Sequence, residues 1–248
     1  MSHSILQGKH AVVFGAGGSI GAAIARQFAA EGAAVFLSGR TKSNVEAVVR
    51  QISADGGHAY AAVLDAADDA AVNQSLDSIV TETGKFDIVL NATWPRARDY
   101  SNGTLAVDLE IDQFLVPMAT IVKSQFITAR AAARRMVKQH SGVIIFVTGS
   151  PARGHVAGAT AIGIAFGAIK NLAENLAVEV SPFGVRVVCF RTLANTDSRT
   201  IQETWEAMNV PKDQAVAQIA NSNFLKTSAS VSDTANAAVL VDPTGRAC

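Results

Sequence analysis

Apolar residues along this chain follow two patterns that alternate. Short apolar runs, which indicate buried strands, are separated by segments in which apolar residues recur every three or four positions, as on one face of a helix. The runs predict strands at 12–14, 35–38, 59–64, 86–90, 143–147 and 185–190. Two of the helical segments are long, at about 117–139 and 160–180. This alternation predicts an α/β fold, a Rossmann-type doubly wound parallel sheet with helices on both faces.

No change in composition marks a linker, so we expect a single domain over residues 1–248. Apolar residues make up 49% of the chain, which is enough for a large core. In a sheet of this kind, ligands bind beyond the carboxyl ends of the strands. Candidate site residues should therefore follow the predicted strands.

The first predicted strand runs into a cluster of glycines that opens a helix. Gly15 permits a tight turn, Ser19 is expected to cap the helix, and Gly21 lets the helix pack closely on the strand. The N–H groups and the positive end of the helix dipole suit the pyrophosphate of a dinucleotide. A plain strand-to-helix turn is the alternative, but the strand before and the helix after favour a nucleotide site.

Charge and cysteine content exclude several classes of function. The 21 basic residues balance the 21 acidic ones, so no basic face for nucleic acid is implied. Cys189 and Cys248 make no disulfide framework and fit a reducing cytoplasm, and no metal-binding cluster is suggested. With no signal-peptide layout and no run of 18 apolar residues, we expect a cytoplasmic protein that does not cross a membrane.

Nearly the whole chain resembles the short-chain dehydrogenase/reductase family. Residues 14–21 are similar to the family's Thr-Gly-x-x-x-Gly-x-Gly, with Ser19 in place of the middle glycine. Leu90-Asn91-Ala92-Thr93 half matches the family's Asn-Asn-Ala-Gly, and residues 176–187 resemble its long helix and the turn into the sixth strand. Asp65 falls where the family places an acid beside the adenine.

The resemblance implies an oxidoreductase that uses a nicotinamide dinucleotide and a small-molecule substrate. The cofactor contacts that it implies are Gly15, Gly18, Ser19, Ile20, Gly21, Asp65, Ala66, Asn91, Ala92 and Thr93.

The end of the second strand bears on the choice between NAD and NADP. NAD-binding proteins place an acid there, about 20 residues after the glycines, for the ribose 2′-OH. This chain has Arg40 and Thr41 instead, which would suit the 2′-phosphate of NADP. Arg40 on a solvated loop is the alternative, but the missing acid favours NADP over NAD.

The family's catalytic residues are replaced. The resemblance implies a Ser-Tyr-Lys set assisted by an Asn, yet the only tyrosines here are Tyr60 and Tyr100, and neither has a lysine four residues later. One register puts Phe166 at the tyrosine and Lys170 at the lysine. A gapless register, which we prefer, assigns the Asn, Ser, Tyr and Lys positions to Ile121, Gly149, Ile162 and Phe166. None of these side chains ionises, so the family's proton transfer cannot operate.

Other polar residues nearby have weaker claims. Ser150 and Thr148 flank Gly149, and a hydroxyl there could orient a substrate carbonyl. Serine and threonine after a strand more often cap turns. His155 has the best-placed pKa for an acid, but a histidine in a surface loop is the reading that we favour. Lys170 is expected to reach solvent. The loop after the fourth strand could recognise an anionic or aromatic ligand, or be simply solvated, through Trp94, Arg96, Arg98 and Tyr100.

The C-terminal part departs most from the family. Residues 192–226 are expected to form the substrate lid, with helices at 198–221 whose Trp205, Met208 and Ile219 suggest an apolar substrate. Thr196 and Ser198 could approach cofactor phosphate. The family's seventh strand has no clear counterpart, so a C-terminal strand is expected to be missing or truncated.

Two functions therefore remain open. One is an NADP-dependent oxidoreductase of a carbonyl or enoyl compound with a non-standard mechanism. The other is an inactive NADP-binding sensor, or the partner subunit of a competent relative. Because both long helices are apolar on more than one face, and relatives pair them across a two-fold axis, we also expect a homodimer or homotetramer.

Overall fold

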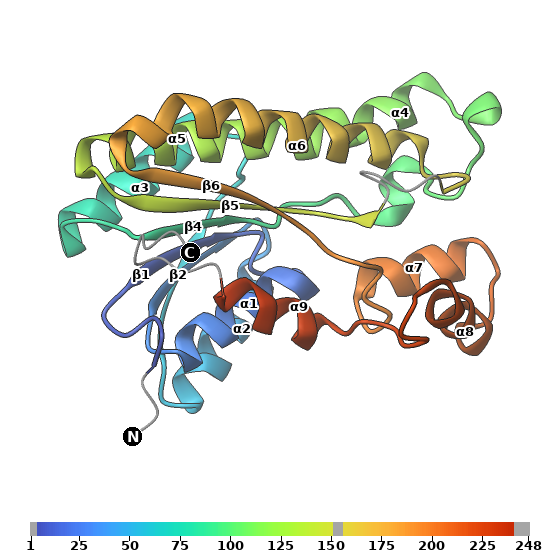
Figure 1. The fold of residues 1–248 in the computed structure, drawn as a ribbon, viewed down its shortest axis with the longest axis horizontal. Coiled ribbons are helices and arrows are strands. Elements are labelled where there is room, and N and C mark those ends of the chain that lie inside the picture. Colours follow the sequence, from blue (N-terminus) through green and yellow to red (C-terminus); the bar gives the residue numbers. More distant parts are fainter. Residues whose placement is uncertain (1–3, 151–155, 241–248) are drawn as a thin grey trace.

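The computed structural model describes residues 4–150 and 156–240. Its centre is a sheet of six parallel strands in the order β3-β2-β1-β4-β5-β6 (Figure 1). The strands are β1 His10–Phe14, β2 Ala34–Gly39, β3 His58–Val63, β4 Ile88–Asn91, β5 Gly142–Thr148 and β6 Val185–Arg191. The Rossmann-type parallel sheet predicted from the sequence is confirmed, with strand ends shifted by one or two residues.

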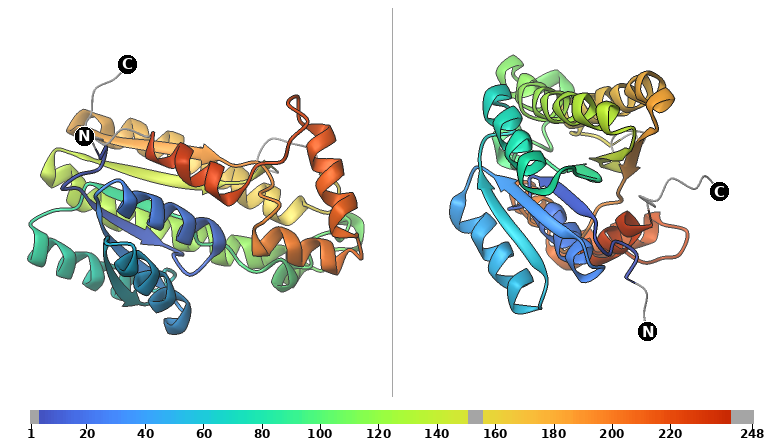
Figure 2. Two further views of the ribbon diagram at one scale, coloured as in Figure 1. Left: turned by 90° about the horizontal axis from the view of Figure 1, so that it is seen from below. Right: turned by 90° about the vertical axis from the view of Figure 1, so that its left-hand side faces the viewer.

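Helices cover both faces of the sheet (Figures 1 and 2). One face carries α3 Asp69–Thr83, α5 Lys123–Gln139 and α6 Thr160–Val180, and the other carries α1 Ser19–Ala30, α2 Lys42–Ala54 and α9 Val231–Val239. The remaining helices are α4 Ile111–Pro117, α7 Arg199–Ala207 and α8 Lys212–Ser222. Each covered face forms its own apolar core. The central strands are buried on both faces, which explains their continuous apolar runs.

The long helix predicted at 117–139 is wrong at its start. Regular helix begins at Lys123 and is preceded by α4, which ends at Pro117, and by a wider π-helical turn at Met118–Val122. Proline has no N–H and its ring crowds the preceding turn, so a regular ladder cannot run through it. The π turn continues the chain and buries Ile121 completely.

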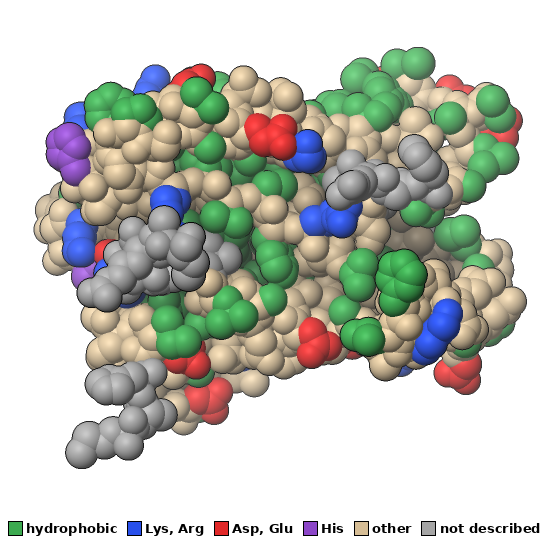
Figure 3. Space-filling view, in the orientation of Figure 1, with side chains coloured by type: hydrophobic (Ala, Val, Ile, Leu, Met, Phe, Trp, Pro, Cys, Tyr) green, Lys and Arg blue, Asp and Glu red, His purple; other side chains and the backbone are tan. Residues whose placement is uncertain are grey.

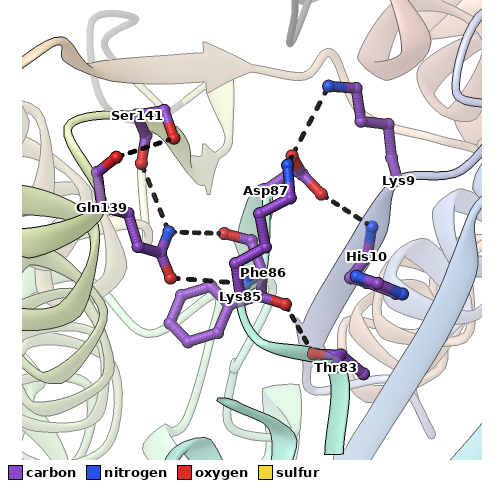
Figure 4. A network of polar contacts seen from close by, with 8 residues as sticks. All are labelled: Lys9, His10, Thr83, Lys85, Phe86, Asp87, Gln139 and Ser141. Atoms are coloured by element: carbon purple, nitrogen blue, oxygen red, sulfur yellow. Dashed lines mark hydrogen bonds and ion pairs between the residues drawn. The ribbon is translucent and has the colours of Figure 1, made fainter.

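A polar network fixes the start of β4, at the end of the sheet away from the glycine cluster (Figure 4). The His10 amide donates to Asp87 at 3.0 Å, and the ammonium groups of Lys85 and Lys9 lie 2.9 and 3.5 Å from the same carboxylate. The Gln139 side chain donates to the Phe86 carbonyl at 3.0 Å. Asp87 therefore aligns β4 with β1 and serves the fold rather than the site.

The two edges of the sheet are formed by β3 and, among the described residues, by β6. The chain then returns across the sheet, and α9 packs along α1. The expected loss of a seventh strand concerns residues 242–248, which lie outside the described residues.

By length and composition alone, α6 and the turn after it are long and apolar enough to cross a membrane, and a third of this apolar stretch is buried inside the protein. Its buried side, which includes Ile162 and Phe166, belongs to the core on one face of the sheet. Ile164 and Val178 lie on its exposed side.

Candidate functional site

A cleft of about 300 Å³ lies at the carboxyl ends of β1, β2, β3 and β4. It is lined by residues from the segments 15–21, 38–45, 64–67, 92–96, 119–124 and 198–203. This volume is at the low end for a small-molecule site, which runs from roughly 300 to 1,000 Å³. The position is where ligands bind in open α/β sheets.

The glycine cluster forms one wall of the cleft because only glycine fits there. Gly15 has φ +81°, and a Cβ on it would collide with the backbone carbonyl of Ala92, the residue that follows β4. A Cβ on Gly21 would collide with the Gly15 carbonyl. The strand, the turn and α1 can therefore approach one another closely, which leaves the first turn of α1 facing the cleft.

The expectation that Ser19 caps α1 is wrong. The N-cap is Gly18, which has no side-chain acceptor for the first-turn N–H groups. Ser19 is the first helical residue, and its hydroxyl instead accepts a hydrogen bond from the Arg199 amide at 3.1 Å. The N–H groups at the start of α1 are thus left for an anion, as in other phosphate sites.

The end of β2 supplies donors without an acid. Arg40 and Thr41 are exposed at the mouth of the cleft, and Ser38 is buried in its lining. The Ser38 hydroxyl has no hydrogen-bond partner within the described chain. A buried hydroxyl without a partner is costly, and an anionic or hydroxylated ligand would satisfy it. This half of the cleft offers donors for the adenosine and phosphate groups of a nicotinamide dinucleotide.

The remaining predicted cofactor residues divide between the lining and the core. Ile20, Asp65, Ala66, Ala92 and Thr93 line the cleft. Asp65 is exposed there, and its carboxylate accepts a hydrogen bond from the backbone N–H two residues later at 2.9 Å.

Asn91 is the exception among the predicted cofactor residues. It is fully buried and absent from the lining. Its side-chain oxygen accepts a hydrogen bond from the Thr128 hydroxyl of α5. Asn91 therefore ties β4 to α5 below the cleft.

The four residues that the gapless register assigns to the family's catalytic positions are packed into the core. Ile121, Ile162 and Phe166 are 0, 6 and 2% exposed, and Gly149 is buried. None of these four residues lines the cleft. Trp94 lies between them and the cleft: its ring centroid is 4.9 Å from that of Phe166, and its indole N–H donates to the Val147 carbonyl at 3.2 Å.

The weaker catalytic candidates are placed as follows. The Ser150 hydroxyl donates to the Thr192 carbonyl at 3.4 Å, a contact that joins the ends of β5 and β6. Lys170 is exposed as expected and pairs with Glu174 at 2.8 Å. His155 lies outside the described residues. Burial raises the pKa of Tyr100, which is only 3% exposed.

An ion pair that the sequence did not predict joins the loop after β4 to the lid, within the lining of the cleft. Arg96, in the loop after β4, binds Glu203 of α7 through two nitrogen–oxygen contacts. The hydrogen bond from Arg96 lowers the pKa of Glu203, so this carboxylate is ionised near neutral pH. The Asn102 side chain donates to the Thr204 hydroxyl at 3.0 Å beside this pair. The loop and the lid are therefore held together.

The lid helices differ in one respect from the prediction. The residues that α7 contributes to the cleft are polar: Ser198, Arg199, Thr200 and Glu203. The Ser198 hydroxyl caps α7, Trp205 is buried, and Met208 is half exposed. The apolar lid residues thus do not line the cleft, and their presence is no guide to an apolar substrate.

Comparison with known proteins identifies the family. The family described as short chain dehydrogenase matches residues 9–208. The chain is 36% identical over 185 residues to the short-chain reductase protein NovJ of Streptomyces niveus, covering 74% of this chain and 68% of NovJ. It is 29% identical over 182 residues to a 7alpha-hydroxysteroid dehydrogenase of Escherichia coli K12, covering 73% of this chain and 69% of that protein.

Two solved structures have the same fold. An NAD+-bound xylitol dehydrogenase superposes with a TM-score of 0.86 at 24% identity, covering 96% of this chain and 93% of that one. An actinorhodin polyketide ketoreductase with NADPH superposes with a TM-score of 0.85 at 18% identity, covering 96% and 91%. One neighbour holds NAD+ and the other NADPH, so the comparison leaves open which of the two nucleotides this chain prefers. By the match over 200 of its 248 residues, the chain belongs to the short-chain dehydrogenase family.

Proposed function

We propose that this protein binds an NADP-type nucleotide in the cleft and does not reduce ketones by the family's acid–base mechanism. The observation that carries the proposal is the contrast between the two ends of the cleft. Glycines, a free helix start and hydroxyls line the end beside β1 and β2, whereas at the other end Trp94 packs against Phe166, which our register assigns to a catalytic position.

The residues available for the nucleotide have distinct roles. The start of α1 and the glycines would hold the pyrophosphate, and Asp65 would lie beside the adenine. Arg40 and Thr41 would bind the 2′-phosphate, which favours NADP over NAD. In a dehydrogenase the nucleotide supplies or accepts a hydride, and the protein must then move a proton.

Proton transfer is the step for which the described lining of the cleft offers no suitable group. A positioned general acid contributes about 10²- to 10⁴-fold. The ionisable residues of the described lining are Arg40, Asp65, Arg96, Arg199 and Glu203. Asp65 would lie beside the adenine, Glu203 is held ionised by Arg96, and arginine does not lose its proton in proteins. Ketone reduction should therefore be at least about a hundredfold slower than in relatives.

Family membership supports a second candidate function, an oxidoreductase of a carbonyl or enoyl compound with a non-standard mechanism. Ser150 and His155 are the residues whose replacement would test it. In this reading a hydroxyl or an imidazole contributed by these residues takes over part of the lost chemistry.

Calorimetry with NADPH tests the nucleotide binding that both functions share, and turnover assays distinguish the two. With a panel of ketones and enoyl compounds, turnover should be at least about a hundredfold below that of a relative with the intact catalytic set. Family-typical turnover that survives Ser150→Ala and His155→Ala would contradict our assignment of the catalytic positions. Turnover that either substitution abolishes would favour the second function.

A further inference from the structure

The topology divides the possible nucleotide site into two halves. In doubly wound sheets a dinucleotide lies across the crevice between two mononucleotide-binding halves, here β1–β3 and β4–β6. The described cleft lining comes from the ends of the first three strands, the segment after β4, the residues 119–124 before and in α5, and the lid residues 198–203. Gly149, Ser150 and Thr192, which directly follow β5 and β6, are absent from it. Among the strand ends of the described residues, the cleft therefore reaches from β3 to β4 and not to β5 or β6.

Trp94 forms the wall at which the cleft stops. One side of it lines the cleft, and the rest packs against the cores on both faces of the sheet. Its ring meets Phe166, which is 2% exposed, and its N–H is bound to the Val147 carbonyl. An indole fixed by a hydrogen bond and by packing on several sides occupies one position, because moving it would leave a cavity and an unpaired donor.

The lid closes the same end from the opposite side. Arg96, two residues after Trp94, pairs with Glu203 of α7, and Ser19 accepts from the Arg199 amide. The lid is therefore attached both to the glycine cluster and to the loop that carries Trp94. These contacts hold α7 against the cleft, where Arg199, Thr200 and Glu203 are part of its lining.

On the basis of the proposed nucleotide binding, we infer that the cleft recognises the adenosine 2′-phosphate and pyrophosphate part of its ligand and excludes the nicotinamide part. Trp94 is the residue that determines this specificity. The ligand class therefore includes nicotinamide-free nucleotides such as 2′-phospho-ADP-ribose, and the nicotinamide ring of NADP would remain outside the cleft.

Calorimetry with nucleotide fragments tests the inference. NADP and 2′-phospho-ADP-ribose should bind with dissociation constants within roughly threefold of each other, less than 1 kcal/mol apart. Nicotinamide mononucleotide should show no binding at millimolar concentration. If NADP binds about tenfold or more tightly than 2′-phospho-ADP-ribose, the nicotinamide is recognised and the inference is overturned, although nucleotide binding stands. If no nucleotide binds, the proposed function is wrong and the inference is overturned with it.

Saturation-transfer NMR on the unmodified protein gives an independent readout. Adenine protons of bound NADP should receive saturation from the protein, and nicotinamide ring protons should receive little. Equal transfer to both rings would overturn the inference.

A Trp94→Ala variant tests the residue itself, with Phe183→Ala, which removes an exposed aromatic side chain just before β6, as the control. Trp94→Ala should shift the preference toward NADP over 2′-phospho-ADP-ribose by several-fold, and the control should not. A preference that is the same in a folded Trp94→Ala protein and in the parent would overturn the assignment to Trp94. If Trp94→Ala does not fold, the NMR comparison on the unmodified protein still tests whether the nicotinamide ring is excluded.

Discussion

Trp94 and Phe166 pack with ring centroids 4.9 Å apart and planes inclined at 54°. The gapless register predicted from the sequence assigns Phe166 to the lysine position of the family's catalytic set. Here that position faces an indole, within a core that also contains Ile121 and Ile162. The replacements form one continuous apolar cluster, so a single reverse substitution cannot recreate the catalytic site.

Phe166→Lys should therefore destabilise the protein without conferring ketone reduction. It would bury an ammonium group at a position that is 2% exposed and among apolar neighbours. We expect a loss of at least about 2 kcal/mol in the free energy of unfolding, measured by urea denaturation, because unpaired buried charges are among the costliest substitutions. Phe166→Leu is the control and should lose less. A stable Phe166→Lys variant that reduces ketones would contradict the packing argument.

Arg40→Ala should remove most of the preference for NADPH over NADH. A hydrogen bond to a charged group contributes about 1.5 to 3 kcal/mol, so the affinity for NADPH should fall roughly tenfold or more. The affinity for NADH, which has no 2′-phosphate, should change little. Arg50→Ala, on the exposed side of α2, is the matched control. Equal affinities of the unmodified protein for the two nucleotides in calorimetry would show that Arg40 does not read the phosphate.

The sequence was sufficient to predict the fold because strands and helices have different periods of apolar residues. It also located the wall of the cleft at Gly15 and Gly21, since a strand that breaks into glycines before a helix restricts the backbone to few arrangements. It failed at Ser19, because the residue that caps a helix is set by backbone angles, and Gly18 has the extended conformation of an N-cap. The π turn before Lys123 was missed because apolar spacing does not distinguish it from a regular helix.

Contacts between distant segments were beyond prediction from local patterns. Arg96 and Glu203 are 107 residues apart, and no signal near either residue indicates the other. The sequence pattern predicts a ligand contact or a solvated loop residue at Trp94, yet this residue is partly buried against both cores. A large aromatic directly after a buried strand is the one signal that could have indicated a core position.

Breaking the Arg96–Glu203 pair should loosen the lid. In Arg96→Ala, amide hydrogen exchange in α7 should accelerate, because the loop after β4 no longer holds this helix. Arg98→Ala is the control, since Arg98 is exposed and its ion pair, a long contact of 3.9 Å, is with the adjacent residue Asp99. Unchanged exchange in α7 would show that the pair contributes nothing to closure.

The same ion pair predicts a pH dependence of the lid. The pKa of Glu203 lies below its ordinary value of 4.5, mainly through the hydrogen bond from Arg96. A lowered pKa means that the stabilising contribution is complete above the ordinary value and is lost as the pH falls through the lowered one. Protection of α7 should therefore decrease in the acid range. Glu203→Gln should remove this dependence.

Asp87→Asn should destabilise the sheet at neutral pH but much less in acid. Burial raises the pKa of Asp87, but the His10 amide together with Lys85 and Lys9 lowers it by more, so the net pKa is below its ordinary 3.8. Its contribution is thus present above pH 3.8 and lost as the pH falls through the lowered pKa. At pH 7 we expect Asp87→Asn to cost about 1.5 to 3 kcal/mol in denaturation experiments.

Exposed ion pairs should not behave in this way. Glu46→Gln, which removes the exposed contact with Lys42, should change the stability by less than about 1 kcal/mol. A cost of Asp87→Asn that is the same at pH 7 and at pH 3 would show that its charge has no part in holding β4.

Self-association should use the exposed apolar surface of the helical layer. Phe126 of α5 and Ile164 and Val178 of α6 are 45, 48 and 75% exposed. Further apolar side chains are exposed on α4, where Figure 3 shows them grouped at the upper right, and these include Ile111 and Leu115. Apolar surface on several neighbouring helices indicates an interaction site, and symmetric pairing would cover it.

We therefore expect a homodimer or homotetramer in light scattering at micromolar concentration. Ile164→Glu combined with Val178→Glu should shift the protein toward the monomer, because each copy would place like charges against its symmetry mate. Val63→Glu is the matched control: Val63 is 51% exposed but lies on β3, at the opposite edge of the sheet from β6. If the unmodified protein is a monomer, or if both variants associate as the unmodified protein does, the exposed face of α6 is not the contact surface.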